Sequence, residues 1–282
     1  MKLFITGGKG MLGRTLQRRF WDHEVFVADL PEVDMLDKAS LEKSVRDFSP
    51  DCIIHCAAMT RVDDCEANRD LAFRLNRDGS ANVAEAAALV DARLIAISTD
   101  YVFSGDRAQG GYLESDEPAP RTVYGESKLA GEKAVLARLP SAVVLRIAWL
   151  YGAGGPSFIH TMARLGAQDG QPLKVVNDQR GNPTSTDAVA DAIAFLFDHP
   201  EVHGIVHGTC SGTCTWYDLT VELFRILGLS RAVVPCTTAE FPRPAPRPAN
   251  SALEKTVLES LGFKMPDWRD ALATFAAVEF RT

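Results

Sequence analysis

The first strand-like segment of the chain, Lys2–Thr6, runs directly into a glycine-rich turn. The turn is Gly7-Gly-Lys-Gly-Met-Leu-Gly13, so its glycines at 7, 10 and 13 fall where a strand should give way to a helix. Gly7 allows a tight turn, Gly10 lets the backbone approach a pyrophosphate, and Gly13 lets the helix pack closely on the strand. The helix N-terminus would then face the phosphates. The segment therefore predicts a dinucleotide-binding βα unit.

Short apolar runs alternate with helical patterns over the first 150 residues or so. Such alternation predicts βαβ units with a parallel sheet, and the nearly continuous apolar character of Arg93-Leu-Ile-Ala-Ile-Ser98 indicates burial on both faces. We expect an α/β fold, a doubly wound parallel sheet of the Rossmann type. The expected strands are Lys2–Thr6, Glu24–Leu30, Cys52–Ala58, Arg93–Thr99 and Ala142–Tyr151, and the expected helices are Leu12–Phe20, Ser40–Phe48, Asp70–Val90 and Tyr124–Arg138.

The pattern becomes less regular after residue 152. We therefore predict a dinucleotide-binding domain over 1–152 and a smaller C-terminal α/β lobe over 153–282 that mainly binds the substrate, with segments around 173–198 packing back on the sheet. The segment Phe241–Pro248 carries four prolines and is expected to be a pocket-forming loop without regular backbone pairing.

Charge and composition exclude several classes of protein. The chain of 282 residues has a formal net charge of -7, which gives no general attraction for nucleic acid or for anionic membranes. No apolar run reaches the length of a membrane span and no signal-peptide pattern precedes the first strand, so a cytoplasmic protein is expected. The six cysteines match no disulfide framework or zinc spacing, and no acidic cluster compels a metal; a homodimer is left open.

An acidic residue is expected about 20 residues after the glycine turn, at the end of the second strand, to bind ribose hydroxyls. Asp29 occupies that place. Its carboxylate favours NADH because it repels a 2′-phosphate, whereas Arg14, just past the turn, would favour NADPH. The sequence leaves the choice between NADH and NADPH open.

A tyrosine and a lysine stand one helical turn apart in Tyr124-Gly-Glu-Ser-Lys128. An adjacent ammonium favours tyrosinate, so Lys128 is expected to bring the pKa of Tyr124 toward neutral pH. Thr99 ends the fourth expected strand, on the side of the sheet where ligands bind, and its hydroxyl would hold a substrate carbonyl for hydride attack. We therefore predict Thr99, Tyr124 and Lys128 as the catalytic residues of a reductase.

These motifs, in this order, resemble the extended short-chain dehydrogenase/reductases, and more narrowly the dTDP-4-dehydrorhamnose reductase family. The resemblance covers nearly the whole chain. It rests on Ala57–Glu66, Ser98–Phe103, Tyr124–Glu132, Arg146–Gly152, Asn177–Thr184 and Arg247–Leu253.

The resemblance implies NAD(P)H-dependent reduction of the C4 ketone of dTDP-4-dehydro-L-rhamnose to dTDP-L-rhamnose, a precursor of cell-surface polysaccharide. It implies that Tyr124 donates the proton, Lys128 binds the nicotinamide ribose and Thr99 tunes the tyrosine. The cofactor residues that it implies, with those of the glycine turn, are Gly7, Gly10, Met11, Leu12, Gly13, Asp29, Asp34, Met35, Ala57, Ala58, Met59, Tyr124 and Lys128. The substrate residues that it implies are Thr99, Asp100, Trp149, Arg247 and Asn250.

Two other interpretations stay open at this stage. One is a related enzyme that reduces or epimerises another NDP-4-keto-6-deoxysugar, since the stereochemical outcome depends on substrate pose. The other is a non-catalytic regulatory subunit that keeps the fold and binds NADP.

Overall fold

Six strands form the main sheet of the computed structural model, which describes residues 1–280. All neighbouring pairs are parallel, and the spatial order is β10-β5-β4-β3-β1-β2. The expected doubly wound parallel sheet is therefore confirmed. The strands are β1 (Lys2–Thr6), β2 (Glu24–Ala28), β3 (Cys52–His55), β4 (Arg93–Thr99), β5 (Val143–Ile147) and β10 (Gly204–His207).

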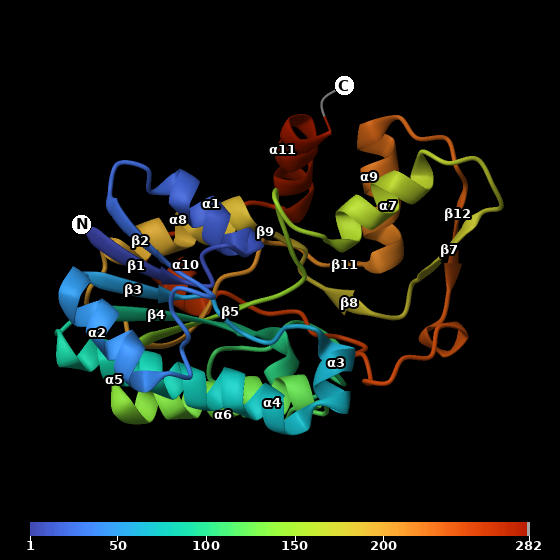
Figure 1. The fold of residues 1–282 in the computed structure, drawn as a ribbon. Coiled ribbons are helices and arrows are strands. Elements are labelled where there is room, and N and C mark those ends of the chain that lie inside the picture. The colour runs from blue at the N-terminus through green and yellow to red at the C-terminus, as the bar shows by residue number, and fades with distance from the viewer. Residues whose placement is uncertain (281–282) are drawn as a thin grey trace.

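Helices cover both faces of this sheet (Figure 1). In β1, Leu3 and Ile5 pack into one hydrophobic cluster and Phe4 into the other, because successive side chains of a strand point to opposite faces. Burial on both faces explains why the strands are apolar throughout. On one face lie α1 (Met11–Arg19) and α8 (Thr186–Phe197), and on the other lie α2 (Lys38–Phe48), α5 (Ser80–Leu89) and α6 (Val123–Arg138).

The strand order reverses between β1 and β3. The chain leaves β1 for β2 on one side and then returns to place β3 on the other side, with Thr6 opposite His55 in register. Ligands of open α/β sheets bind in the crevice at the carboxyl ends of strands that diverge in this way. The fold therefore directs attention to the loops after β1, β3 and β4.

A second group of elements lies beyond those carboxyl ends, at the right of Figure 1. Three pairs of short strands belong to it: β6 (Leu150–Tyr151) with β9 (Thr184–Ser185), β7 (Leu173–Val176) with β12 (Val233–Cys236), and β8 (Arg180–Gly181) with β11 (Cys214–Thr215). Its helices include α7 (Phe158–Gly166), α9 (Trp216–Leu227) and α11 (Trp268–Glu279). The chain returns to the main sheet with α8 and β10 and packs α10 (Thr256–Ser260) beside β10, so the two groups are interleaved in sequence after residue 152.

Two expected elements are interrupted. The segment expected as one strand over Ala142–Tyr151 divides into β5 and β6, because Trp149 adopts a left-handed backbone conformation with φ of 47°. The segment expected as one helix over Asp70–Val90 is α4 (Arg69–Phe73), a π-helical segment (Arg74–Gly79) and α5. The spacing of apolar residues carries no information about a single φ angle or about a change from i→i+4 to i→i+5 hydrogen bonding. It therefore predicts neither the break at Trp149 nor the π-helical segment.

Shorter elements complete the chain, and two strands end earlier than expected. The helix α3 (Val62–Ala67) follows the loop after β3, and 3₁₀ turns occupy Asp100–Val102 and Thr238–Glu240. The second strand stops at Ala28 and the third at His55, because the residues after them turn away to line a cavity.

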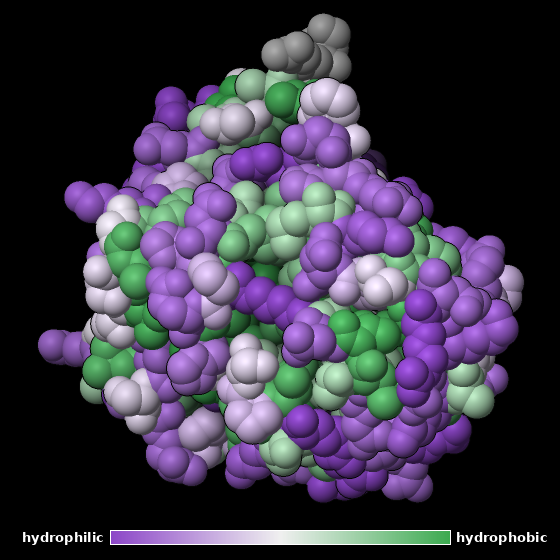
Figure 2. Space-filling view, turned by 90° about the vertical axis from the view of Figure 1, so that its left-hand side faces the viewer, coloured by the Kyte–Doolittle hydropathy of each residue, from purple (hydrophilic) through white to green (hydrophobic). Residues whose placement is uncertain are grey.

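In residues 1–280 no helix combines the length and apolarity needed to cross a membrane. On the molecular face shown in Figure 2, apolar residues form separate groups among hydrophilic ones.

A buried ion pair joins α6 to β5. Arg146 donates to both carboxylate oxygens of Glu132, at 2.9 and 2.6 Å, and the two side chains are only 2% and 3% exposed. Ser98 donates to the same carboxylate at 2.5 Å. The Glu132 carboxylate therefore holds α6 against β4 and β5.

Replacing Arg146 with methionine is expected to lower the free energy of unfolding by about 3–5 kcal/mol, because it leaves Glu132 buried without its counter-charge. Urea unfolding of the variant measures this loss. Arg138→Met is the matched control, since Arg138 pairs with Glu85 on the surface and exposed pairs contribute at most about 1 kcal/mol. Equal losses in the two variants would contradict the prediction.

Candidate active site

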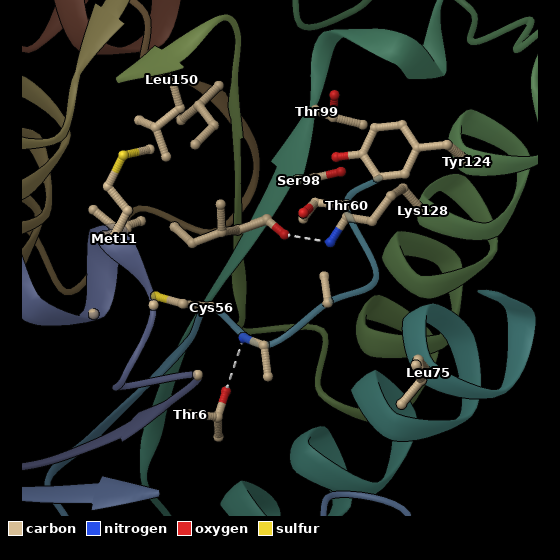
Figure 3. Close-up of a pocket in the computed structure, with 18 of the residues that line it drawn as sticks. Thr6, Met11, Cys56, Thr60, Leu75, Ser98, Thr99, Tyr124, Lys128 and Leu150 are labelled. Atoms are coloured by element: carbon tan, nitrogen blue, oxygen red, sulfur yellow. Dashed lines mark hydrogen bonds between the residues drawn. The ribbon is translucent and has the colours of Figure 1, made fainter. Parts of the chain in front are cut away.

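A cavity of about 880 Å³ opens at the carboxyl ends of the central strands. Its walls come from the turn after β1, the ends of β2 and β3, the end of β4 and the start of α6. Figure 3 shows side chains from these elements converging on it. Its size and its position at the switch point are typical of ligand sites in such folds.

The glycine turn depends on close backbone packing. Gly7 has φ of 65°, and a Cβ atom on it would lie 2.7 Å from the backbone nitrogen of Ala57. A Cβ atom on Gly13 would lie 2.5 Å from the carbonyl oxygen of Gly7. Gly10 is the N-cap of α1 and brings no side-chain oxygen, so first-turn N–H groups stay available to phosphate oxygens. Gly7, Gly10, Met11, Leu12 and Gly13 all line the cavity.

Asp29 lies at the end of the cavity next to β2, together with Asp34 and Met35. Its carboxylate accepts hydrogen bonds from the backbone N–H groups of Lys9 and Leu30, each at 2.8 Å. The ammonium of Lys9 donates to the carbonyl of Leu30, the residue after Asp29, and pairs with Glu32, each at 2.7 Å. Lys9 therefore brings a positive charge to this end of the cavity.

Arg14, which sequence analysis considered as a contact for a 2′-phosphate, makes a different contact in the structure. Its guanidinium donates to the carbonyl of Gly154 at 3.1 Å, and the residue is absent from the cavity wall. Gly154 belongs to the loop before α7, so Arg14 joins α1 to the second group of elements.

The loop after β3 contributes Ala57 and Ala58 to the cavity wall. Met59, expected beside them, does not line the cavity. Its backbone is held by the Asn76 side chain, which accepts from the Met59 N–H at 2.8 Å and donates to the Met59 carbonyl at 3.0 Å. These two hydrogen bonds therefore fix the path of the loop after β3 at Met59.

Thr99, Tyr124 and Lys128 lie together in the cavity wall, as Figure 3 shows. Tyr124 and Lys128 stand near the start of α6, where the Thr122 hydroxyl caps the helix by accepting from the Gly125 N–H. Lys128 donates to the carbonyl of Ile97 at 2.7 Å. The structure therefore brings the three expected residues to one end of the cavity.

Burial governs the protonation of these groups. It raises the pKa of Tyr124, and contact with the Thr99 hydroxyl lowers that pKa by less. Burial also lowers the pKa of Lys128 to about 8, against the attraction of Glu132. The expectation that Lys128 brings the Tyr124 pKa down does not hold in this structure, because desolvation of the phenol is the largest effect and the ammonium is bonded to Ile97.

Asp100 is buried beside Thr99 and has one free oxygen. Thr99 donates to Oδ1 at 3.0 Å, whereas Oδ2 has no hydrogen-bond partner among residues 1–280. Burial raises the pKa of Asp100 to about 6, with hydroxyl groups of Ser251 and Thr99 acting in the other direction. A buried acceptor without a partner in the cavity wall suits a ligand hydroxyl.

Trp149 lines the cavity but does not present a free face. Its ring stacks on Trp216, with centroids 3.5 Å apart and planes 4° from parallel. Trp216 donates to the Gln179 side-chain oxygen at 3.1 Å, and both residues also line the cavity. One face of the Trp149 ring is therefore occupied by another indole.

Arg247 and Asn250 lie outside the cavity wall. Arg247 pairs with Asp63 at 2.8 Å and donates to the Ala245 carbonyl at 2.9 Å. Asn250 donates to the carbonyls of Arg107 and Gly110, both at 3.0 Å, and is 7% exposed. Both side chains are hydrogen-bonded within the protein, so the structure does not bring them to the site that the resemblance implied.

No group of three or more His, Cys, Asp or Glu side chains in the described residues is placed to hold a metal ion.

The match to known proteins covers nearly the whole chain. The family model described as the RmlD substrate binding domain matches residues 1–280. The chain belongs to the RmlD substrate-binding-domain family.

Relatives of this RmlD-family chain include a protein of Streptomyces antibioticus named "Probable dTDP-4,6-dihydroxy-2-methyloxan-3-one 4-ketoreductase". The two are 44% identical over 96% of this chain and 93% of the relative. A crystal structure of a dTDP-4-dehydrorhamnose reductase from Clostridium acetobutylicum has a TM-score of 0.95 at 41% identity and covers 100% of both chains. A dTDP-4-dehydrorhamnose reductase from Bacillus anthracis, in complex with NADP, has a TM-score of 0.93 at 38% identity over 97% of this chain and 98% of its own.

Lys9, Gln179 and Trp216 are three of the cavity residues that sequence reasoning on this RmlD-family chain missed. Lys9 stands inside the quoted glycine turn, so attention to the one charged residue of that turn would have found it. Trp216 begins a helix behind a Thr215–Asp218 capping box, a signal that marks a helix start and carries no information about a ligand. Gln179 has no local signal of its own.

Substitution of Gly181 with alanine is expected to displace the Trp149 ring, because the added Cβ would lie 2.5 Å from Trp149 Cε2. The stacked indole pair should lose its coupled near-ultraviolet circular dichroism signal. Gly228→Ala is the control for adding a methyl group without a clash: Gly228, unlike Gly181, has a positive φ, but no atom lies within 4 Å of the added Cβ. An unchanged spectrum in Gly181→Ala would show that Trp149 is not held by this contact.

Proposed function

We propose that the protein reduces the C4 ketone of dTDP-4-dehydro-L-rhamnose to the alcohol of dTDP-L-rhamnose, with NADPH or NADH as the hydride donor. The observation that carries the proposal is that one cavity joins the glycine turn and Asp29 to Thr99, Tyr124 and Lys128. Two of the similar solved structures are named as dTDP-4-dehydrorhamnose reductases, which supports the choice of sugar nucleotide.

The glycine turn and the end of β2 fit a dinucleotide. Gly7 and Gly13 pack against neighbouring backbone with no room for a side chain, which keeps the turn tight, and Gly10 leaves the start of α1 open to a pyrophosphate. Asp29 stands where ribose hydroxyls would donate. Bound there, the nicotinamide supplies a hydride to the carbonyl carbon. The Lys9 ammonium, paired with Glu32, lies at the same end of the cavity, where a 2′-phosphate would compete with Glu32 for it, so the Asp29 carboxylate alone does not decide between NADH and NADPH.

Tyr124 is suited to donate the proton to the carbonyl oxygen. Because burial raises its pKa, the phenol stays protonated at neutral pH until the oxygen of the ketone gains negative charge. The bond from oxygen to hydrogen then forms as the hydride arrives at carbon, and the phenol is left as tyrosinate. Lys128 lies one turn along α6, where its ammonium donates to the Ile97 carbonyl and has further hydrogens to donate to a ribose hydroxyl.

Asp100 is suited to orient the sugar. Its Oδ2, which accepts no hydrogen bond from residues 1–280 although the Ser251 hydroxyl lies close enough to lower the Asp100 pKa, would accept from a hydroxyl of the ring. Arg247 and Asn250 are not part of this proposal, because their side chains are bonded within the protein.

A second candidate is reduction of a different dTDP-4-keto-6-deoxysugar. It is favoured by the relative at 44% identity, whose name specifies another 4-ketosugar. Both candidates use the same proton donor and differ in how the sugar sits between Asp100 and the indole pair.

The direct test mixes purified protein with dTDP-4-dehydro-L-rhamnose and either NADPH or NADH, follows nicotinamide absorbance and identifies the product by chromatography. Tyr124→Phe is expected to lower kcat by at least about 100-fold with little change in cofactor affinity, because it removes only the transferable proton. No oxidation by the wild type with this sugar, but oxidation with another 4-ketosugar, would favour the second candidate. Near wild-type turnover in Tyr124→Phe would overturn the assignment of the proton donor.

The pH dependence should report on Lys128. Its pKa is lowered to about 8, so the charged form is present below that pH and is lost as the pH rises through it. We expect kcat/KM for the cofactor to fall above about pH 8, and Lys128→Met to show a lower value without this fall. Asp100→Asn should keep the fall, since burial raises the pKa of Asp100 only to about 6. Persistence of the fall in Lys128→Met would assign it to another group.

A further inference from the structure

A buried histidine contacts Thr6, a residue of the cavity wall, and the catalytic scheme does not use it. His55 is the last residue of β3 and is 1% exposed. Its Nδ1 lies 2.7 Å from the Thr6 hydroxyl and its Nε2 lies 2.9 Å from the Ser80 hydroxyl. Both ring nitrogens therefore have partners on different elements, β1 and α5.

The partners of Ser80 determine which nitrogen carries the proton. The Ser80 hydroxyl donates its hydrogen to the carbonyl of Asn76 at 2.7 Å, so toward His55 it can only accept. His55 Nε2 must therefore carry the hydrogen. Burial and the charge of Lys128 lower the pKa of His55 to about 3, which keeps the ring neutral at physiological pH. A neutral ring with a protonated Nε2 has a bare Nδ1 that accepts from Thr6.

The chain of hydrogen bonds continues toward the cofactor end of the cavity. Thr6 donates to His55 and accepts from the backbone N–H of Ala57 at 3.3 Å, a contact drawn in Figure 3. Ala57 and Thr6 both line the cavity, and Gly7 begins the glycine turn directly after Thr6. One side of His55 thus holds the backbone on which a dinucleotide would lie.

The chain also continues toward the proposed catalytic helix. The Asn76 amide nitrogen donates to the Ser127 hydroxyl at 2.9 Å, and Ser127 donates to the carbonyl of Tyr124 at 2.9 Å. The same Asn76 side chain holds both backbone groups of Met59. The other side of His55 is thus connected, through Ser80 and Asn76, to the residue proposed as proton donor.

We propose that His55, held as the Nε2–H tautomer, is a positioning residue that couples the cofactor-facing loop after β3 to the start of α6. Its ring bonds Thr6 through one nitrogen and Ser80 through the other. Loss of one nitrogen's bond therefore separates an effect on the cofactor-facing loop from an effect on the start of α6. The Nδ1 side orders Thr6 and Ala57, and the Nε2 side orders Ser80, Asn76 and Ser127. The effect on turnover rests on the proposed function, whereas the tautomer and the effect on cofactor binding do not.

Two amide variants test the two sides separately. In His55→Asn the amide oxygen takes the place of Nδ1 and can still accept from Thr6, but no atom reaches Ser80. In His55→Gln the amide nitrogen reaches the place of Nε2 and can donate to Ser80, but Thr6 loses its acceptor. We expect His55→Asn to lower kcat about tenfold with cofactor Kd within about threefold of wild type, and His55→Gln to weaken cofactor Kd about tenfold with kcat within about threefold.

His207→Asn is the matched control. His207 is also buried and bonds the Glu254 carbonyl at 2.7 Å, but it belongs to β10, and Glu254 does not line the cavity, whereas Thr6, the partner of His55, does. We expect this variant to lose stability without a change in kcat or cofactor Kd. Equal changes of kcat and Kd in the two His55 variants, or changes matched by His207→Asn, would reduce His55 to a structural residue and overturn the proposal.

A measurement on the wild-type protein covers the case in which the variants do not fold. Correlation of ring nitrogens with ring protons in ¹⁵N-histidine-labelled protein should show His55 with a protonated Nε2 and a bare Nδ1 from about pH 5 to about pH 9. A protonated Nδ1 would overturn the proposal whether or not the protein reduces any sugar. If no 4-ketosugar is reduced, the proposed function fails. The comparison of cofactor Kd between His55→Gln and His55→Asn still tests whether His55 orders the cofactor-facing loop.

Discussion

The close approach of two backbones at the carboxyl ends of β1 and β3 is the constraint on which the site depends. Thr6 and His55 face each other in register, and just beyond them Gly7 and Ala57 are so close that a Cβ on Gly7 would lie 2.7 Å from the Ala57 backbone nitrogen. Since the strand order reverses here, both loops diverge from this point and leave a crevice between them. A side chain at position 7 would separate the strands and open the floor of the cavity.

Burial at this edge of the sheet acts on several titratable groups in the same sense. It favours the neutral form of each, so the pKa values of Tyr124 and Asp100 are raised and those of Lys128 and His55 are lowered. The charge of Glu132 raises the pKa of Lys128 against this effect. Arg146 holds Glu132 in place, and through Glu132 it influences the charge of Lys128 in the proposed active site.

The features that sequence analysis predicted well are those whose surroundings are local or set by strand register. The bounds of β1 and β4 follow from uninterrupted apolar runs, and Tyr124 and Lys128 share a face because both stand on one helix. Arg247 shows what local patterns leave out: its partner Asp63 lies 184 residues away in the chain, and no local pattern indicates such a pair. The positive φ of Trp149 is likewise imposed by packing and cannot be derived from composition.

The two halves of the cavity differ in how they are specified. The cofactor half is built by strand ends and a glycine turn, so any sequence that keeps the register and those glycines keeps its shape. The other half is built where Trp149 from the first group of elements stacks on Trp216 from the second, against the backbone of Gly181. That wall depends on how separate segments pack, so small changes in packing alter it without disturbing Thr99, Tyr124 or Lys128. Similar proteins are named for different 4-ketosugars, and a wall whose shape depends on packing is a part of the cavity that can differ in shape while the strand ends and the glycine turn stay as they are.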